Sequence, residues 1–207
     1  MTIKNKNIKG KIPVLEEFYS IQGEGFNTGK ASYFIRTGGC DLACSWCDSK
    51  ESWDHTAHQY IDINEIIKRI NKTSVNTVIV TGGEPLIYNF DEFCNKAKAA
   101  GLNTMIETCG AHNFSGKWDW ICLSPKKHKP PKNVYFNFAN ELKVIIFDKE
   151  DFNWAEKCAK KVSESCLLYL QPEWSRFDVN AKMIVEYVKT NIKWNISIQT
   201  HKFLKIP

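Results

Sequence analysis

Short runs of β-branched and aromatic residues alternate with segments of helical periodicity along almost the whole chain, and this alternation constrains the fold most. The predicted strands are Tyr33–Arg36, Thr77–Thr81, Asn103–Glu107, Trp120–Leu123, Leu142–Phe147, Leu167–Gln171 and Asn195–Gln199. Predicted helices lie between them: one capped by Asp62, one capped by Asp91 and ending at Gly101, and two over 151–163 and 179–189. The repetition predicts an α/β fold with a mainly parallel sheet, either a partial barrel or an open sheet.

The length and charge of the chain limit its organisation and its partners. A chain of 207 residues with 43% hydrophobic content can bury one sizeable core, so we expect a single domain over residues 1–207, with 1–12 as a polar N-terminal extension. The net charge of +5 is spread as single Lys and Arg residues from end to end. This distribution gives no concentrated footprint for nucleic acid, and we expect no nucleic-acid partner.

The expected compartment follows from the start of the chain and from its apolar runs. Residues 1–11 are polar and unlike a secretory signal, and stretches such as 144–147 are far shorter than the roughly 20 residues of a membrane helix. We therefore expect a cytoplasmic protein with no membrane association. In that compartment the eight cysteines are thiols, metal ligands or small core residues, because the reducing pool removes most disulfides.

The strongest local signal is a triplet of cysteines, Cys40, Cys44 and Cys47, spaced C-x3-C-x2-C after two glycines. One short loop with this spacing can point three thiolates at one metal centre, and structural metal sites usually have four protein ligands. The missing ligand leaves two interpretations. A Cys3His zinc site would be completed by His55 or His58, whereas an iron–sulfur cubane would keep one iron open to a small molecule.

The triplet resembles that of the radical S-adenosylmethionine superfamily, in which such a cluster cleaves S-adenosylmethionine reductively. The sequence Thr81-Gly82-Gly83-Glu84-Pro85 follows an apolar run and, by composition, is an ordinary turn after a strand. It also resembles the superfamily's GGEP motif, whose backbone groups receive the methionine ammonium. The resemblance implies a [4Fe–4S] cluster, S-adenosylmethionine as cofactor, and a partial TIM-type barrel.

A second set of polar residues lies upstream of the cysteines. The glycine-rich segment 19–25 has the properties of a turn, and Arg36 could simply pair with a surface acid. Alternatively, the amide of Gln22 suits the edge of a pterin or purine, and the planar fork of Arg36 suits a carboxylate.

The motifs together resemble those of the 7-carboxy-7-deazaguanine synthase family, over residues 17–207. They are S-I-Q-G-E-G at 20–25, R-x3-C-x3-C-x-W-C-D-S at 36–49, GGEP at 82–85, E-T-C-G at 107–110, S-P-K at 124–126, Q-P at 171–172 and the tail Q-T-H-K at 199–202. The resemblance implies a lyase that contracts the ring of 6-carboxy-5,6,7,8-tetrahydropterin to 7-carboxy-7-deazaguanine with loss of ammonia. The reaction would serve the biosynthesis of 7-deazapurines, including queuosine.

The resemblance also implies roles for particular residues, and none of them is an acid–base catalyst because the radical arises on the cofactor. Cys40, Cys44 and Cys47 would bind the cluster, and Ser49 would bind Mg²⁺. S-Adenosylmethionine would contact Gly83, Glu84, Ser124, Pro125, Lys126, Gln171, Pro172 and Glu173. The substrate would contact Ile21, Gln22, Gly23, Arg36, Thr81 and the terminal carboxylate of Pro207.

The resemblance further implies a flavodoxin or ferredoxin as electron donor and a homodimer. Two rivals are weighed against this function. A glycyl-radical enzyme activating protein shares the triplet and the cofactor, but would not need the acid-binding set of Gln22, Glu24 and Arg36. A zinc-stabilised RNA-binding module would interleave basic and aromatic residues on one face, a pattern that the chain does not show. Cys94, Cys122, Cys158 and Cys166 are predicted core residues, and Cys109 a filler beside the cofactor loop.

Overall fold

The computed structural model describes residues 8–54, 56 and 58–207, and the chain divides into two compact units. The first unit comprises residues up to Ser20, Ala31–Thr108 and His112–Trp120, and the second comprises Ile21–Lys30, Cys109–Ala111 and Ile121–Pro207. His55 and residues 1–7 of the expected N-terminal extension lie outside the described residues. Within the described part of the chain, no helix is long and apolar enough to cross a membrane.

The first unit contains five strands in the order β3-β1-β2-β4-β5. Their bounds are β1 Lys11–Ile21, β2 Ala31–Thr37, β3 Gln59–Asp62, β4 Thr77–Gly82 and β5 Asn103–Thr108. β1 and β3 are antiparallel, whereas β2, β4 and β5 are parallel neighbours, with Thr37 opposite Gly82. The loops that leave β2 and β4 therefore start at the same edge of the sheet.

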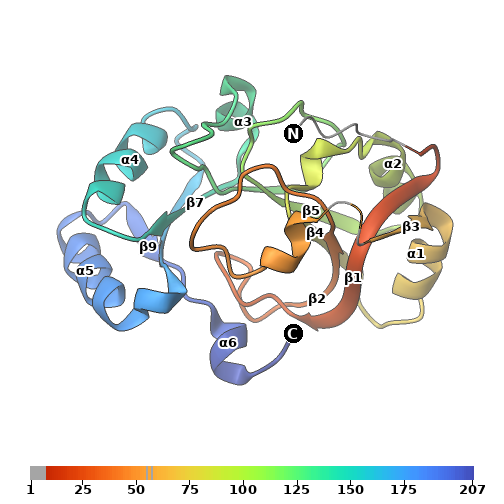
Figure 1. Cartoon of the computed structure of the whole chain (residues 1–207), viewed down its shortest axis with the longest axis horizontal. Helices are drawn as coiled ribbons and strands as arrows, with labels where there is room; N and C mark the ends of the chain where they lie inside the picture. The colour runs from red at the N-terminus through yellow and green to blue at the C-terminus, as the bar shows by residue number, and fades with distance from the viewer. Residues whose placement is uncertain (1–7, 55, 57) are drawn as a thin grey trace. The chain divides into compact units, whose positions relative to one another are not determined.

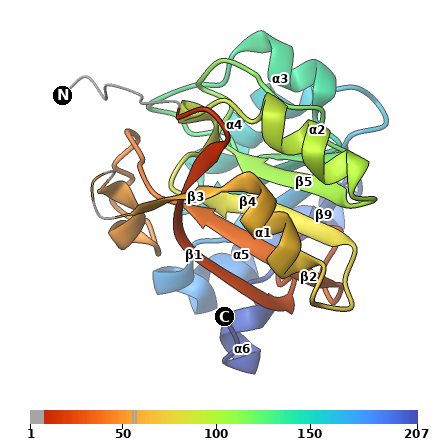
Figure 2. The ribbon, with the colours of Figure 1, turned by 90° about the vertical axis from the view of Figure 1, so that its right-hand side faces the viewer.

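Two α-helices, α1 (Ile63–Ile70) and α2 (Asp91–Ala99), pack against each other in this unit, and α2 also contacts β5 (Figure 2). Asp62 caps α1 as predicted, because its side chain accepts a hydrogen bond from the Asn64 backbone N–H. The predicted cap at Asp91 is wrong: Phe90 is the N-cap, and Asp91 is the first helical residue. Its carboxylate instead accepts a 2.6 Å hydrogen bond from the Gly116 backbone N–H. Short 3-10 turns cover Lys50–Trp53 (η1) and Pro85–Ile87 (η2).

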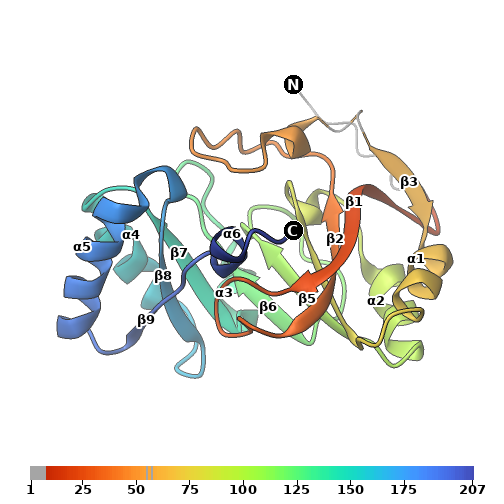
Figure 3. The same cartoon turned by 90° about the horizontal axis from the view of Figure 1, so that it is seen from below.

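The second unit carries the parallel strands β6-β7-β8-β9, of which β7 and β9 are labelled in Figure 1 and all four in Figure 3. Their bounds are β6 Trp120–Leu123, β7 Glu141–Ile146, β8 Leu167–Pro172 and β9 Trp194–Ile196. The helices α4 (Glu150–Ala159) and α5 (Phe177–Thr190) connect them, α4 packing on β7 and α5 on β8 and β9. The predicted last strand is misplaced, because β9 ends at Ile196 and residues 197–199 use their polar groups in contacts with other segments.

Among the described residues, two strands and two α-helices were not predicted from the sequence: β1, β3, α3 (Asn133–Phe138) and α6 (Thr200–Leu204). The 3-10 turns were not predicted either, and the third of them, η3 (Trp174–Arg176), precedes α5. β1 begins inside the expected polar extension, and Ile12 is 1% exposed. The cores of the two units consist of aliphatic and aromatic side chains from strands and helices, including Ile35, Ile66, Ile79, Leu142, Leu170 and Trp194. Cys94, Cys122, Cys158 and Cys166 are buried, as predicted.

Candidate active site

The cysteine loop, residues 40–49, leaves the carboxyl end of β2 in the first unit. Its start is held by backbone bonds from Gly39 N–H to Ser52 O (2.7 Å) and from Cys40 N–H to Trp53 O (3.4 Å). The chain reverses through Gly39 (φ 94°) and Ala43 (φ 49°), and the Cys47 N–H donates to Cys44 O. His112 Nε2 lies 3.0 Å from the carboxylate of Asp41. These contacts bring the three cysteines into one folded loop.

The glycine loop, residues 82–85, leaves β4 and lies against the start of the cysteine loop. Gly83 N–H donates to Thr37 O (3.0 Å), and Glu84 N–H donates to Gly39 O (2.9 Å). A Cβ at Gly83 would lie 2.2 Å from Gly39 O, and one at Gly82, where φ is +126°, would lie 2.3 Å from Thr37 N. The approach of the two backbones therefore requires glycine at both positions.

Glu84 is 2% exposed, and its carboxylate stabilises the glycine loop from within. Oε1 accepts hydrogen bonds from Leu86 N–H (3.0 Å), which caps η2, and from Thr108 Oγ1 (2.5 Å). These bonds give Glu84 a positioning role, in that it fixes the backbone of residues 83–86.

Arg36 and Ser49 lie in contact on the same side of the first unit. Arg36 Nη1 donates to Ser49 Oγ (3.1 Å), and Arg36 Nε donates to Glu16 (2.6 Å). The surface acid that could pair with Arg36 therefore exists, and it is Glu16. Thr81 faces Arg36 in the β2–β4 register, and its carbonyl accepts from Thr37 Oγ1. The structure thus groups three of the residues expected to bind substrate or magnesium.

The thiols of the cysteine loop fit an iron–sulfur cluster. No disulfide joins any of the eight cysteines, all of which lie among the described residues. Cys44 is 8% exposed, and burial raises the pKa of Cys40 to about 11. Binding of iron must therefore displace a proton from Cys40. Three cysteine thiolates are the protein donors that a cubane with one open iron takes, so the chemistry of this donor set suits the cluster. Among the described residues, no three His, Cys, Asp or Glu side chains form a group that could hold a single metal ion.

The substrate loop, residues 21–25, belongs to the second unit and begins at the end of β1. Gln22 is 8% exposed; its backbone pairs with Gly29 and Lys30, and its side-chain oxygen accepts from Glu24 N–H (3.1 Å). Gly23 lies against the C-terminal segment, because a Cβ there would be 2.2 Å from His201 Nδ1. The Gly23 carbonyl also accepts from Thr200 N–H (2.9 Å). The loop is therefore held from both its own turn and the C-terminal segment.

Gln171 and Glu173 lie at the carboxyl end of β8. Gln171 is 2% exposed and accepts a 2.6 Å hydrogen bond from Ser197 Oγ, which itself accepts from Gly25 N–H (2.9 Å). Pro172 is the last residue of β8, and Glu173 caps η3 by accepting from the backbone and hydroxyl of Ser175. The structure thus connects Gln171 to the substrate loop through one serine.

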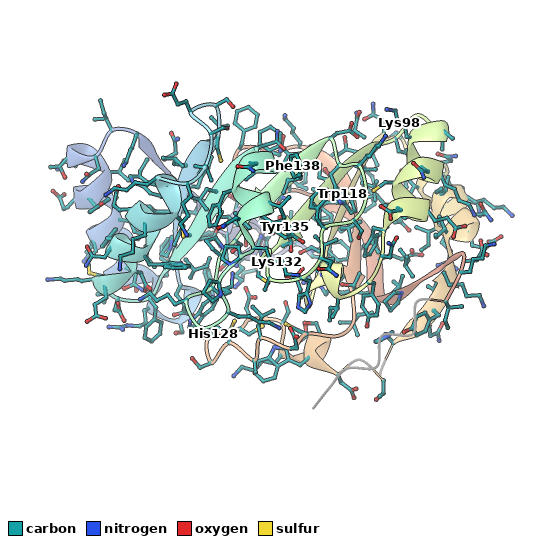
Figure 4. The ribbon with its side chains drawn as sticks, turned by 90° about the horizontal axis from the view of Figure 1, so that it is seen from above. Lys98, Trp118, His128, Lys132, Tyr135 and Phe138 are labelled. Carbon is teal, nitrogen blue, oxygen red and sulfur yellow. The ribbon has the colours of Figure 1, made fainter. Side chains whose placement is uncertain are left out.

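The turn at Ser124, Pro125 and Lys126 follows β6, two strands away from β8 along the same sheet edge. Lys126 Nζ donates to both the carbonyl and the hydroxyl of Ser124, each at 2.7 Å. The chain then continues through the exposed residues His128 and Lys132 to α3, whose Tyr135 is fully buried (Figure 4). The hydrogen bonds from Lys126 to Ser124 therefore stabilise this turn.

The C-terminal segment ends the second unit with α6 (Figure 3). Phe203 packs against the rings of Trp174 and Phe177, with ring centroids 5.4 and 5.2 Å away. The helix ends at Leu204, its C-cap Lys205 has the left-handed conformation, and Ile206 N–H donates back to His201 O (3.1 Å). Pro207 is exposed.

Sequence reasoning missed the charged residues of β7. Glu141 and Lys143 are each 3% exposed and alternate with the apolar residues Leu142 and Val144. Lys143 pairs with Glu24 of the substrate loop, and Glu141 accepts from Phe26 N–H (3.2 Å). The sequence did contain a signal for these residues, namely two charged side chains within the otherwise apolar run of β7. Because buried charges need partners, these two side chains indicated contacts with another segment.

Comparisons with known proteins agree with this geometry. Residues 34–122, which include both loops of the first unit, match the model of the Radical SAM superfamily. The chain is 49% identical to a 7-carboxy-7-deazaguanine synthase from Flavobacterium psychrophilum, over 95% of this chain and 93% of the relative. The chain belongs to the 7-carboxy-7-deazaguanine synthase family. A Synechocystis member is 44% identical over 94% of this chain and 93% of its own.

The fold has a solved counterpart as well. A crystal structure of QueE from Escherichia coli superposes with a TM-score of 0.84 at 24% identity, covering 96% of this chain and all of that one. This likeness, together with the strand–helix repeats of both units, confirms the predicted α/β fold of the radical SAM class with its mainly parallel sheet. As a family member, the chain is a radical SAM lyase that uses a [4Fe–4S] cluster and S-adenosylmethionine.

Proposed function

We propose that this chain converts 6-carboxy-5,6,7,8-tetrahydropterin to 7-carboxy-7-deazaguanine with loss of ammonia, in the biosynthesis of 7-deazapurines such as queuosine. The observation that carries the proposal is the contact of the cysteine loop with the glycine loop at the ends of β2 and β4, beside the paired side chains of Arg36 and Ser49. The relatives at 44% and 49% identity carry the name of this activity.

In the proposed site, Cys40, Cys44 and Cys47 hold the [4Fe–4S] cluster. When bound, the reduced cluster and S-adenosylmethionine supply cleavage of the sulfonium carbon–sulfur bond, which starts radical chemistry at a substrate C–H bond. The chain orients the cofactor through the close-packed backbone at Gly83, which Glu84 fixes. Further proposed contacts come from the sheet edge of the second unit, at Ser124, Pro125, Lys126, Gln171, Pro172 and Glu173.

The substrate's pterin edge is proposed to bind the backbone and amide of residues 21–23, and its carboxylate to bind Arg36. A guanidinium has five N–H donors, so Arg36 can bind a carboxylate while it donates to Ser49. Thr81 and Pro207 complete the proposed substrate contacts. Because the chemistry starts on the cofactor, these residues act by orienting the reacting atoms.

Magnesium is proposed to bind the hydroxyl of Ser49 together with the substrate carboxylate and water. Mg²⁺ retains several waters and takes few protein oxygens, so a single hydroxyl from the chain suffices. The contact between Ser49 and Arg36 supports the proposal, since it places the hydroxyl beside the group proposed to bind that carboxylate.

The partners and the compartment are also proposed. Reduction of the cluster needs a one-electron donor, for which we propose a flavodoxin or ferredoxin, and we propose that the active protein is a homodimer. Eight cysteines without a disulfide among them suit the reducing cytoplasm, which we propose as the site of action.

The test is anaerobic turnover of protein reconstituted with iron and sulfide. Dithionite, Mg²⁺, S-adenosylmethionine and the tetrahydropterin are added, and 7-carboxy-7-deazaguanine is followed by mass spectrometry. Cys44→Ala should abolish product, whereas Cys158→Ala, which removes a buried thiol from α4, should retain it. Formation of 5′-deoxyadenosine without product would overturn the substrate assignment, and retained activity in Cys44→Ala would overturn the cluster assignment.

A further inference from the structure

Lys143 is a charged side chain placed in the interior of the second unit. It lies in the middle of β7 and is 3% exposed, and its Nζ donates to Oε2 of Glu24, which is 14% exposed. Removing two charges from water has a large free-energy cost, which their mutual attraction offsets only in part. An apolar residue of similar size at position 143 is therefore expected to stabilise β7 equally well. The Lys143–Glu24 pair is better explained by the connection that it makes between β7 and the substrate loop.

Glu24 is held on both of its carboxylate oxygens. Gln199 Nε2 donates to Oε1 (2.9 Å), and Gln199 Oε1 in turn accepts from Lys202 Nζ (2.9 Å). The neighbouring backbone bond from Thr200 to Gly23 joins the same two segments. One carboxylate thus ties β7 to the substrate loop and to the segment that leads into α6.

The far side of the substrate loop is held by other groups of the second unit. Gly25 N–H donates to Ser197 Oγ, and Phe26 N–H donates to Glu141 Oε2. At Gly25 (φ 64°) a Cβ would lie 1.9 Å from Glu141 Oε1, so the backbone rests directly on that side chain. Glu141 and Lys143 project on the same face of β7, two residues apart, and hold Phe26 and Glu24, on either side of Gly25.

We propose that Lys143 is a positioning residue for the pterin substrate: through Glu24 it fixes the substrate loop and the start of the C-terminal segment in one arrangement. This inference rests on the proposed function, because residues 21–23 and Pro207 are the proposed substrate contacts. Lys143 acts through Glu24, and cofactor cleavage in the absence of substrate does not depend on it.

The test compares Lys143→Met with two further variants. Lys143→Met keeps the length of the side chain and removes its charge, and the double variant Glu24→Gln/Lys143→Met removes both charges so that no carboxylate is left buried without its partner. The control is Lys189→Met, which breaks an exposed ion pair with Glu186, whose side chains are 64% and 72% exposed.

Four readouts separate positioning from stability. Amide hydrogen exchange without ligands should show protection of residues 22–26 and 200–206 falling about tenfold in both Lys143 variants and unchanged in Lys189→Met. Binding of oxidised 6-carboxypterin, followed by its fluorescence, should weaken about tenfold or more, and the KM for substrate should rise more than kcat falls. Substrate-free formation of 5′-deoxyadenosine should stay within about twofold of wild type.

The inference is overturned if either Lys143 variant folds and keeps both the loop protection and the pterin affinity. It is also overturned if the double variant restores both, because the lysine would then serve only to neutralise Glu24. Failure of the proposed function would look different: the wild-type chain itself would not bind the pterin, while the exchange data would still report whether Lys143 holds the loop.

Discussion

Replacement of Gly83 by alanine tests the contact between the glycine loop and the cysteine loop. The added Cβ would lie 2.2 Å from Gly39 O and 3.0 Å from Cys40 Cβ, and real Cβ contacts essentially never fall below 3.0 Å. The two backbones must therefore separate by about 0.8 Å. The obstacle is a backbone carbonyl, so no side-chain rotation relieves the clash, and the 2.9 Å bond from Glu84 to Gly39 lengthens as well.

This displacement should affect chemistry more than folding. Overpacking of this kind costs about 1–3 kcal/mol of unfolding free energy, whereas a misplacement of about 1 Å in a reacting site costs roughly 10²-fold in rate. We expect Gly83→Ala to bind the cluster, with normal iron content, and to form 5′-deoxyadenosine about 30- to 100-fold more slowly than wild type under dithionite.

Gly101→Ala is the control for the loss of a glycine. Gly101 has φ +75° and open space around its Cβ position, so alanine there is strained locally and meets no other atom. It should lower the unfolding free energy by about 1 kcal/mol and leave cofactor cleavage unchanged. Cleavage by Gly83→Ala within threefold of wild type, with the cluster intact, would refute the argument that this backbone contact positions the cofactor.

Three further predictions concern the metal, pH and the core. In a Mg²⁺ titration of turnover, Ser49→Ala should raise the Mg²⁺ concentration for half-maximal activity about tenfold, whereas Ser49→Thr, which keeps the hydroxyl, should not. The same half-maximal concentration in Ser49→Ala and wild type would exclude Ser49 as a ligand. Partial burial alone would raise the pKa of Glu156, but hydrogen bonds from Lys193 and Trp194 lower it below its usual value. The ionised carboxylate therefore stabilises the fold above about pH 4.5, and this contribution is lost as the pH falls further and the group is protonated. Glu156→Gln should therefore lose less Tm than wild type between pH 5 and pH 3, and parallel curves would contradict this. Ile66→Ala, at a fully buried position of α1, should lower the unfolding free energy measured in urea by about 2–5 kcal/mol. A loss below about 1 kcal/mol would show that neighbouring side chains close the cavity.

The sequence predicted that the cysteine loop and the glycine loop lie at the same edge of the sheet, and the structure places them in contact. Cys40, Cys44 and Cys47 follow one strand and the glycine loop follows the next, and in a parallel sheet such loops share an edge. The apolar runs of β2, β4 and β7 identified these strands because their central residues are buried on both faces. The same local information predicted the cap of α1 at Asp62.

The elements that were missed depend on contacts distant in sequence. β1 combines the buried residues 12–14 with the acidic residues Glu16 and Glu17, so it lacks a continuous apolar run. β3 has four residues and is defined by its pairing with β1. Lys143 and Glu24 are 119 residues apart, and no local pattern relates the two side chains.

The central claim is that the cysteine loop holds a [4Fe–4S] cluster whose open iron binds S-adenosylmethionine. Electron paramagnetic resonance of the anaerobically reconstituted, dithionite-reduced protein tests it most directly. The account predicts the signal of a reduced [4Fe–4S] cluster that changes when S-adenosylmethionine is added and disappears in Cys44→Ala. A signal indifferent to the cofactor, or a protein that retains zinc in place of iron, would contradict it.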